Sequence, residues 1–387
     1  MGKSHVAVIG AGAFGAWTAL FLLRRGARVT LLDAWGPGNS RASSGGETRI
    51  MRAGYGPNQP YSRMAARALT LWREHEVRWA RTMFHQTGVL WMAGKNDAFE
   101  RGSLAELRDA GVPYEELSVG ELKKRWPQIN FEGVQWGFHE PEGGYLTARG
   151  ACLSAVAGFL EEGGEFRQAW VKGEAIESAP IGDVLLSDST RLAADQYVFA
   201  CGPWLGKIFP DTIGDKILAT KQDVLFLGAP RGTDLFEETR LPVWADHGEH
   251  FMYGIPGNQY RGFKVADDTR GAPFDPTSGE RMVSPETIRK VREYLSFRFP
   301  LMKDAPIVET RVCQYENSPD HNFIIDRHPR AENVWIVGGG SGHGFKHGPA
   351  LGEMVAELVV ENKSTDPLFG LERFATVTNP KHKPQTY

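Results

Sequence analysis

The start of the chain constrains its fold more than any other stretch. Val6–Ile9 is a short apolar run, typical of a strand that is buried on both faces of a parallel sheet. Gly10, Gly12 and Gly15 follow it at G-x-G-x-x-G spacing, and Asp33 ends a second apolar run further on. The first glycine permits a tight turn, and the second lets a pyrophosphate approach the backbone. The third lets the next helix pack against the strand.

The helix after this turn strengthens the same interpretation. We expect it to run from about Ala13 to Arg25 and to end at Gly26, which suits a left-handed cap. Free N–H groups and the dipole at the start of a helix favour an anion. The carboxylate of Asp33 can accept hydrogen bonds from an adenosine ribose. A glycine turn without a ligand would require three glycines and an acid to fall at these spacings by chance, so the stretch predicts dinucleotide binding.

Length and charge bound what the rest of the chain can be. At 387 residues the chain is long for one core, which predicts two domains. Hydrophobic residues make up 41% and charged residues 24%, as in an ordinary soluble globular protein. The net charge of −3, from 44 basic and 47 acidic residues, gives no electrostatic reason to expect nucleic acid or an anionic membrane as the main partner.

The cysteines and the apolar runs bear on location. Cys152, Cys201 and Cys313 are scattered and odd in number, which argues against a disulfide framework and for a reducing compartment, the cytoplasm. The first strand begins almost directly after Met1, so we expect no secretory signal. No apolar run approaches the roughly 18 residues of a membrane span.

The order of the predicted elements indicates an interrupted nucleotide domain. After a long amphipathic helix, short strands and helices without a βαβ rhythm indicate an inserted second domain, and an apolar strand ending at Cys201 and Gly202 returns to the first. A strand-rich stretch then visits the inserted domain again. We expect the nucleotide domain to comprise 1–85, 146–215 and 319–387, and the inserted domain to comprise 86–145 and 216–318. The predicted class is α/β, with a Rossmann-like domain interrupted by a domain of mixed β-sheet plus helices.

The C-terminal part repeats the order of strand, glycine-rich loop and helix that is predicted at the start of the chain. The apolar strand Asn333–Gly338 runs into a loop dense in glycine, and a helix with an apolar stripe follows. So many glycines are costly to order, and a close ligand contact explains them better than a simple connector. We therefore expect a second ligand contact at this loop.

Five motifs in order resemble the D-amino-acid-oxidase superfamily of flavoproteins, and within it the monomeric sarcosine oxidase branch with its N-methyltryptophan oxidase and pipecolate oxidase relatives. The motifs are Gly10–Gly15 with Asp33, Ser43–Arg52, Gly262–Lys264, Cys313–Tyr315 followed by Pro319–Asp326, and Gly340–Lys346. The resemblance covers nearly the whole chain. It implies FAD rather than NAD, with the interrupted domain holding FAD and the inserted domain covering a substrate pocket.

The resemblance also implies roles near the flavin ring. Cys313 would join the flavin covalently as a thioether, and Lys264 would be the cation that promotes reaction with oxygen. Arg49 would lie beside the ring and raise its electron affinity. From the residues alone, Cys313 could equally be a small buried hydrophobe and Lys264 an exposed strand lysine.

The remaining roles concern the substrate and the cofactor cradle. Arg52 and Lys346 would bind a substrate carboxylate, although Arg49 and Arg52 read in isolation as solvated surface arginines. Tyr253 lies in the segment expected to shape the pocket. No metal ligands are expected. The expected cofactor-binding residues are Gly10, Gly12, Ala13, Phe14, Gly15, Asp33, Ser43, Ser44, Thr48, Arg49, Val171, Cys201, Gly202, Cys313, Gly340, Gly342, His343, Gly344, Phe345 and Lys346.

Two departures from the family pattern bear on the substrate. Gly45–Gly46 and Asp267–Asp268 stand where relatives often have histidines, so sarcosine itself is not the expected substrate. The resemblance implies a monomer that oxidises the C–N bond of a secondary amine or an N-methyl or cyclic amino acid to an imine, reducing O2 to H2O2. One alternative is a dehydrogenase of the same fold that passes electrons to a quinone or a carrier protein. The other is a tRNA-modifying flavoprotein, which the near-neutral charge disfavours.

Overall fold

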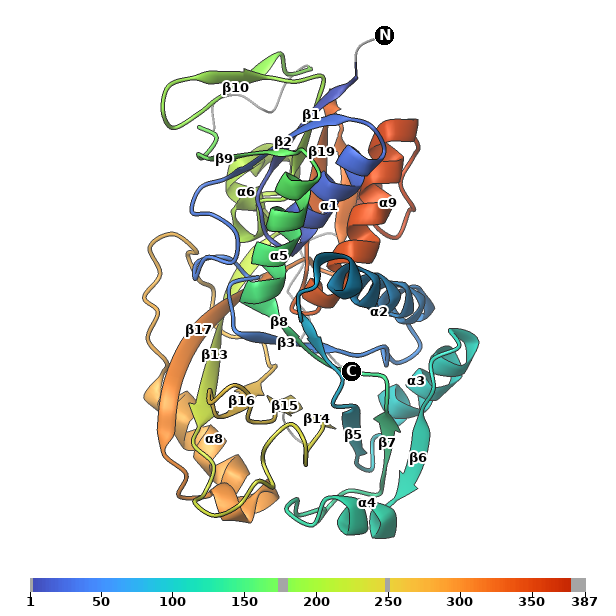
Figure 1. Ribbon diagram of the computed structural model, residues 1–387, viewed down its shortest axis with the longest axis vertical. Helices are drawn as coiled ribbons and strands as arrows, with labels where there is room; N and C mark the ends of the chain where they lie inside the picture. Colours follow the sequence, from blue (N-terminus) through green and yellow to red (C-terminus); the bar gives the residue numbers. More distant parts are fainter. Residues whose placement is uncertain (1–2, 173–179, 248–250, 377–387) are drawn as a thin grey trace.

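The computed structural model describes residues 3–172, 180–247 and 251–376. The fold has two halves, a mostly parallel sheet with its helices at the N-terminal end of the molecule and a larger mixed sheet at the opposite end (Figure 1). A small sheet of β3 (Thr48–Met51), β4 (Phe84–His85) and β8 (Gly144–Thr147) lies between them.

The first sheet is built around the N-terminal strand. In the described part of the chain its order is β18-β19-β12-β1-β2-β9, and every neighbouring pair is parallel except β18 with β19. Val8 pairs with Leu31 on one side and Val198 on the other, and all three are buried. The prediction of a strand buried on both faces is therefore confirmed. The strands are β1 (His5–Ile9), β2 (Arg28–Asp33), β9 (Glu165–Gln168), β12 (Gln196–Phe199), β18 (Ile324–His328) and β19 (Ala331–Gly338).

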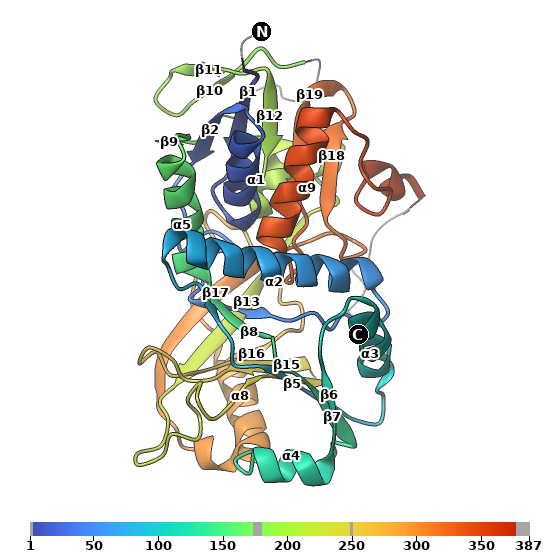
Figure 2. The same cartoon turned by 45° about the vertical axis from the view of Figure 1, so that its right-hand side comes forward.

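Three helices cover one face of this sheet, and a fourth crosses beneath them. The helix after the dinucleotide turn, α1 (Ala13–Arg24), lies between α5 (Ala148–Glu161) and α9 (Gly348–Glu361), and α2 (Gln59–Trp79) runs across their ends (Figure 2). Gly26 has φ of +92°, as expected of a left-handed cap. The predicted strand, turn and helix are thus present, and α9 packs directly on the first helix of the dinucleotide unit.

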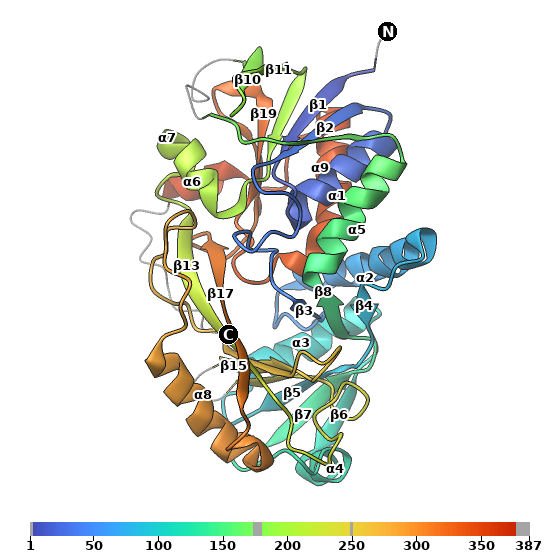
Figure 3. The same cartoon turned by 60° about the vertical axis from the view of Figure 1, so that its left-hand side comes forward.

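The second sheet takes strands from two separate stretches of the chain. Its order is β17-β13-β16-β15-β14-β5-β7-β6, and the long strands β13 and β17 reach from it toward the parallel sheet (Figure 3). Its strands are β5 (Val89–Ala93), β6 (Glu115–Ser118), β7 (Trp136–Glu140), β13 (Leu218–Leu227), β14 (Val243–His247), β15 (Phe251–Ile255), β16 (Phe263–Asp267) and β17 (Ile307–Asn317). The predicted class, a Rossmann-like part interrupted by a mixed sheet with helices, is confirmed. The exact boundaries of the two domains stay predictions.

The other elements complete the two halves. Three helices belong with the mixed sheet: α3 (Ala98–Asp109), α4 (Val119–Arg125) and α8 (Pro285–Arg298). The short elements are α6 (Leu205–Ile208), α7 (Pro210–Ile213), β10 (Asp183–Leu185), β11 (Arg191–Ala193), η1 (Gly202–Trp204), η2 (Pro300–Met302), η3 (Phe345–His347) and η4 (Leu371–Thr376). Among the described residues, no helix combines the length and apolar character needed to cross a bilayer.

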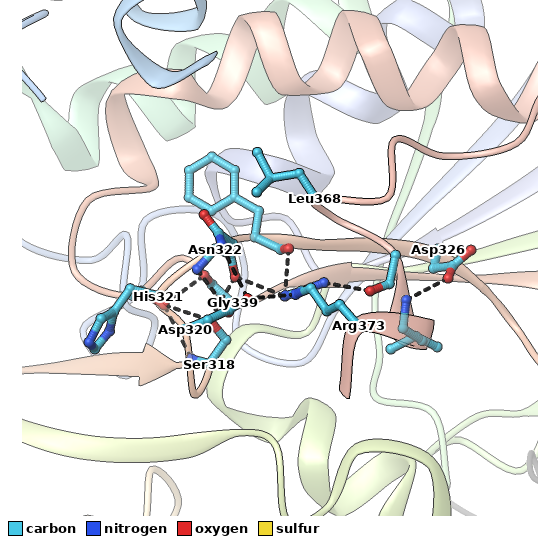
Figure 4. Close-up of polar contacts among 12 residues, drawn as sticks. Ser318, Asp320, His321, Asn322, Asp326, Gly339, Leu368 and Arg373 are labelled. Carbon is cyan, nitrogen blue, oxygen red and sulfur yellow. Dashed lines mark hydrogen bonds and ion pairs between the residues drawn. The ribbon is translucent and has the colours of Figure 1, made fainter. Parts of the chain in front are cut away.

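The segment after α9 fastens the turn that joins β17 to β18. Arg373 of η4 pairs with Asp320 at 2.9 Å and donates to the carbonyl of Asn322 at 3.2 Å (Figure 4). The amide of Leu371 donates to Asp326 at 2.7 Å. These contacts hold the turn between β17, which lines the cofactor cavity described below, and the strand next to β19.

Candidate cofactor and active site

One large cavity runs between the parallel sheet and β17. Its volume is about 710 Å³, within the range of ordinary ligand sites. It is lined by residues from at least six separate stretches of the chain. The residues expected from the sequence that line it are Gly10, Gly12, Ala13, Phe14, Asp33, Ser43, Ser44, Arg49, Val171, Cys201, Gly202, Gly340, Gly342, Gly344 and Phe345.

The dinucleotide turn closes one end of this cavity. The amide of Ala11 donates to one oxygen of Asp33 at 2.8 Å, and the amide of Trp35 donates to the other at 2.9 Å. These bonds orient the carboxylate, while burial raises its pKa. A Cβ on Gly15 would lie 1.8 Å from the carbonyl oxygen of Gly10, so helix and strand can approach this closely only at a glycine.

An aromatic and charged cluster near Asp33 was not foreseen from the sequence. Trp35 and Trp204 lie with ring centroids 5.0 Å apart, and both line the cavity. Trp204 Nε1 donates to the hydroxyl of Thr277 at 2.8 Å, and Arg41 donates to the Thr277 carbonyl at 2.7 Å. The connection between β16 and α8 is thereby tied to this rim. No spacing rule pointed to these residues, because tertiary contacts alone bring them together.

The C-terminal glycine loop meets the dinucleotide turn inside the cavity. A Cβ on Gly344 would lie 2.7 Å from the ring of Phe14, and a Cβ on Gly342 would lie 2.7 Å from the ring of Tyr315. Gly342 also has φ of +82°, which favours glycine. Aromatic rings of the protein therefore account for glycine at these two positions, and the expected ligand contact at this loop stays a prediction.

Two cations and a thiol meet at the far end of the cavity. Arg49 of β3 donates to the sulfur of Cys313 at 3.1 Å. The Thr48 carbonyl accepts from Arg49 at 2.8 Å and from Lys264 Nζ at 3.1 Å. Lys264 also lies 5.4 Å from the ring of Tyr253. Only 3% of Lys264 is exposed, so the reading of this residue as an exposed strand lysine is wrong.

This environment changes the charge state of Lys264. Burial, with the positive charge of Arg49 as the second cause, lowers the pKa of Lys264 from its usual value to about 7. The ammonium and neutral amine forms are therefore both accessible near neutral pH. A lysine with such a pKa can gain or lose its positive charge when pH or a nearby charge changes.

A second pair of cations lies beside the glycine loop. Lys346 Nζ donates to the Tyr55 hydroxyl at 2.7 Å and to the His343 carbonyl at 2.8 Å. The guanidinium carbon of Arg52 lies 4.3 Å from the centre of the Tyr55 ring. Arg52 is 8% exposed, so its reading as a solvated surface residue is wrong. Burial, and then the charge of Arg52, holds the pKa of Lys346 well below its usual range.

Glu140 at the end of β7 fixes the backbone next to Arg52. Its carboxylate accepts hydrogen bonds from the amides of Ala53 at 2.7 Å and Gly54 at 3.1 Å, and from Trp91 Nε1 at 2.7 Å. Burial raises the pKa of this carboxyl group. Arg52 itself donates to the carbonyl of Gly54. The turn carrying Arg52 is therefore held from a strand of the other sheet.

The cavity suits an elongated cofactor with a nucleotide at one end. The start of α1 and the glycine loop bring backbone groups to the cavity, and Asp33 offers a carboxylate. The hydroxyls of Ser43 and Thr48 are buried and have no hydrogen-bond partner among the described residues. These features fit FAD. Five of the expected cofactor-binding residues lie outside the lining, namely Gly15, Thr48, Cys313, His343 and Lys346, and so do the other expected site residues Lys264, Arg52 and Tyr253. Gly15 lets α1 pack closely against β1. Thr48, Cys313 and Lys346 make the hydrogen bonds described above, and Nε2 of His343 lies 3.0 Å from the His321 carbonyl oxygen.

Comparisons with known proteins agree with this geometry. The profile of the family described as FAD dependent oxidoreductase matches residues 5–358. The chain is 28% identical to monomeric sarcosine oxidase of Bacillus sp. (strain B-0618), over 93% of each chain. It is 28% identical to N-methyl-L-tryptophan oxidase of Yersinia pestis (strain Pestoides F), over 95% of this chain and 98% of that one. The crystal structure of L-proline dehydrogenase from P. horikoshii superposes with a TM-score of 0.83 at 24% identity, over 96% and 98% of the two chains. The chain therefore belongs to the FAD dependent oxidoreductase family.

Proposed function

We propose that this enzyme oxidises the C–N bond of a secondary amine, or of an N-methyl or cyclic amino acid, to an imine, and that O2 is reduced to H2O2. The observation that carries the proposal is two sets of buried cations beside the cavity. Lys264 shares the Thr48 carbonyl with Arg49, which lines the cavity, and Lys346 directly follows Phe345, which also lines it. Relatives named for sarcosine and N-methyl-L-tryptophan, both N-substituted amino acids, support the substrate class.

Arg52 and Lys346 are proposed to hold the carboxylate of the substrate. A guanidinium and an ammonium can together supply several charged hydrogen bonds to one carboxylate. Both side chains are buried, and the nearby acid Glu140 is already occupied by two amides and an indole. A substrate carboxylate would supply negative charge where burial otherwise disfavours the ammonium of Lys346.

The redox chemistry belongs to the cofactor, and the chain supplies the electrostatics. FAD, when bound, would supply the two-electron chemistry: the amine loses two electrons and two protons to become the imine, and O2 gains two electrons and two protons to become H2O2. Lys264 is proposed to present a positive charge where oxygen acquires negative charge. Tyr253 forms one side of the Lys264 surroundings and is proposed to contact the substrate.

We also propose that Cys313 joins FAD covalently. Its sulfur accepts a hydrogen bond from Arg49, which lines the cavity, so the sulfur lies next to the end of the site that holds the proposed reacting groups. The test is the mass of the denatured protein. An FAD adduct that disappears in Cys313→Ser supports the link, and wild-type protein of unmodified mass rejects it.

Two further proposals accompany this function. The aspartates Asp267–Asp268, where relatives often have a histidine, lead us to propose an amine other than sarcosine. We propose a monomer working in a reducing compartment, which the three free cysteines support.

A visible spectrum followed by anaerobic titration tests the function. The spectrum should have the bands of bound flavin, and a substrate from a panel of N-methyl and cyclic amino acids should bleach them without oxygen. Readmission of air should restore the bands with one H2O2 formed per amine. Bleaching without reoxidation by air would instead favour a dehydrogenase that uses a quinone or a carrier protein. No bleaching by any secondary amine would contradict the proposal.

A further inference from the structure

Glu316 is an acidic group inside the cofactor cavity that the dinucleotide motif does not include. It belongs to β17, and only 7% of the residue is exposed. Its Oε1 accepts a hydrogen bond from the amide of Gly340 at 3.2 Å. Its Oε2 is buried without a hydrogen-bond partner in the part of the chain that the structure describes. One oxygen of this carboxyl group therefore remains to be satisfied inside the cavity.

The neighbours of Glu316 come from three separate elements that line the cavity. A Cβ on Gly202 would lie 3.1 Å from Oε2, and a Cβ on Gly340 would lie 3.0 Å from Oε1 and 3.8 Å from the ring of Phe14. Phe14 belongs to the first turn of α1, and Tyr315, the residue before Glu316, contacts Gly342. The carboxyl group thus lies where the start of α1, the turn after β12 and the glycine loop meet.

Charge decides which form of Glu316 suits this position. FAD carries a negatively charged pyrophosphate, which an ionised carboxylate in the same cavity would repel. A protonated carboxyl group is a hydrogen-bond donor instead. Burial raises the pKa of Glu316 to about 7, so the protonated form is readily reached at neutral pH. Among the described residues, burial and the hydrogen bond from the Gly340 amide are what act on the pKa of this carboxyl group, and no charge of a lysine or arginine contributes.

We infer that Glu316 binds the middle of FAD as a neutral acid, with its Oε2 hydroxyl donating a hydrogen bond to an oxygen of the ribityl–pyrophosphate chain. Bound FAD then favours the protonated carboxyl group over the carboxylate. Affinity for FAD is greatest below the pKa that Glu316 has in the protein without FAD, and the affinity falls as the pH rises through that pKa. Above that pH, FAD binding takes up a proton.

Other titratable groups near Glu316 respond differently. Cys201 and Asp33 lie on neighbouring elements, and burial raises the pKa of both, which keeps the thiol protonated over this range. His343 of the glycine loop has its pKa held well below the usual range by burial and by Lys346. Arg49 lines the same cavity and stays charged throughout. Lys264, beside Arg49, also has a pKa that burial lowers to about 7, so the comparison with Glu316→Gln is what assigns a change near neutral pH to Glu316.

FAD affinity as a function of pH tests the inference. The full chain carries Cys313→Ser in every sample, so that binding is reversible, and flavin fluorescence quenching gives Kd from about pH 6 to about pH 9. With Glu316 present, Kd should rise up to about tenfold per pH unit above neutral pH. In Glu316→Gln, whose amide donates at every pH, Kd should change by less than about twofold. Glu316→Ala should bind about threefold to tenfold more weakly at low pH.

Two controls make failure interpretable. Glu309→Gln changes a carboxylate of the same strand that pairs with Arg311 outside the cavity, and should leave the pH dependence unchanged. Titration calorimetry in buffers of different ionisation enthalpy counts the protons taken up when FAD binds, and it does so in protein with Glu316 unchanged. Uptake of up to one proton at about pH 8 supports the inference. No uptake, or the same pH dependence in Glu316→Gln, overturns it.

Discussion

The two ends of the cofactor cavity are built in opposite ways. At one end, a single stretch of chain supplies the turn, the helix start and the carboxylate, with the amide of Ala11 already bonded to Asp33. At the other end, Arg49, Lys264 and Cys313 come from three strands that are far apart in sequence. The first end needs correct local backbone, whereas the second needs the whole fold to assemble.

The ends also differ in charge. Asp33 is an acid that serves as an acceptor, whereas the opposite end gathers Arg49 and Lys264 on one backbone carbonyl. An acceptor at the nucleotide end affects how tightly the cofactor binds. Cations at the other end affect how charge that develops during the reaction is stabilised. Mutations at the two ends should therefore change different measurements, affinity at one and rates at the other.

Lys264→Met should give the largest effect. Removing the positive charge should slow reoxidation of the reduced enzyme by O2 by roughly 10²–10³-fold, with a much smaller change in anaerobic reduction by substrate. Stopped-flow absorbance measures the two steps separately. Lys290→Met, which removes an exposed lysine of α8, is the control and should change neither step. If the rate of reduction fell more than the rate of reoxidation, Lys264 would not act in the reaction with oxygen.

Arg52→Gln should have the next largest effect, on the substrate step. Loss of the guanidinium should lower kcat/KM for an amino-acid substrate by about 10–100-fold, because a charged hydrogen bond to the carboxylate is lost. For the matching amine without a carboxylate, the loss should be within about threefold. The surface variant Arg67→Gln, which breaks an exposed pair with Glu353, provides the control. Equal losses for both substrates would mean that Arg52 acts on the fold instead.

The end near Asp33 was predictable because its signal is local. The steric need for glycine at position 15 arises from an atom only five residues away, the carbonyl of Gly10. Strand, turn, helix and acid are all encoded within one supersecondary unit, which folds alike in many proteins. The α/β class followed from the same local patterns.

Much of the cavity could not be predicted from patterns in the sequence. Trp204 and Thr277 are 73 residues apart, and the contact of Gly344 with Phe14 joins opposite ends of the chain. Burial of Lys264 depends on how β16 packs against the strand carrying Arg49, and periodicity does not report it. Family resemblance located Lys264, but Glu316 was missed because an acid on a strand has no spacing signature.

Asp33→Asn tests the nucleotide end by itself. The amide keeps one acceptor oxygen, but its NH2 group faces the donating amide of Ala11 or Trp35, so the side chain should lose its present orientation. FAD affinity in the reversible Cys313→Ser protein should fall by about tenfold. The rate of reduction in enzyme saturated with FAD should change by less than about twofold. A rate loss that persists at saturation would contradict the division of roles between the two ends.

The pH dependence of the oxygen step should give the smallest effect and the sharpest comparison. Lys264, whose pKa burial lowers to about 7, is a cation below that pH and a neutral amine above it. If the positive charge promotes the reaction with O2, the reoxidation rate should fall by about fivefold from pH 7 to pH 8. Lys264→Met should show no such decline. A wild-type rate that rises with pH would mean that the neutral amine is the active form. A decline retained in Lys264→Met would place the titrating group elsewhere, with Glu316 at the middle of the cavity as the other group whose pKa lies near 7.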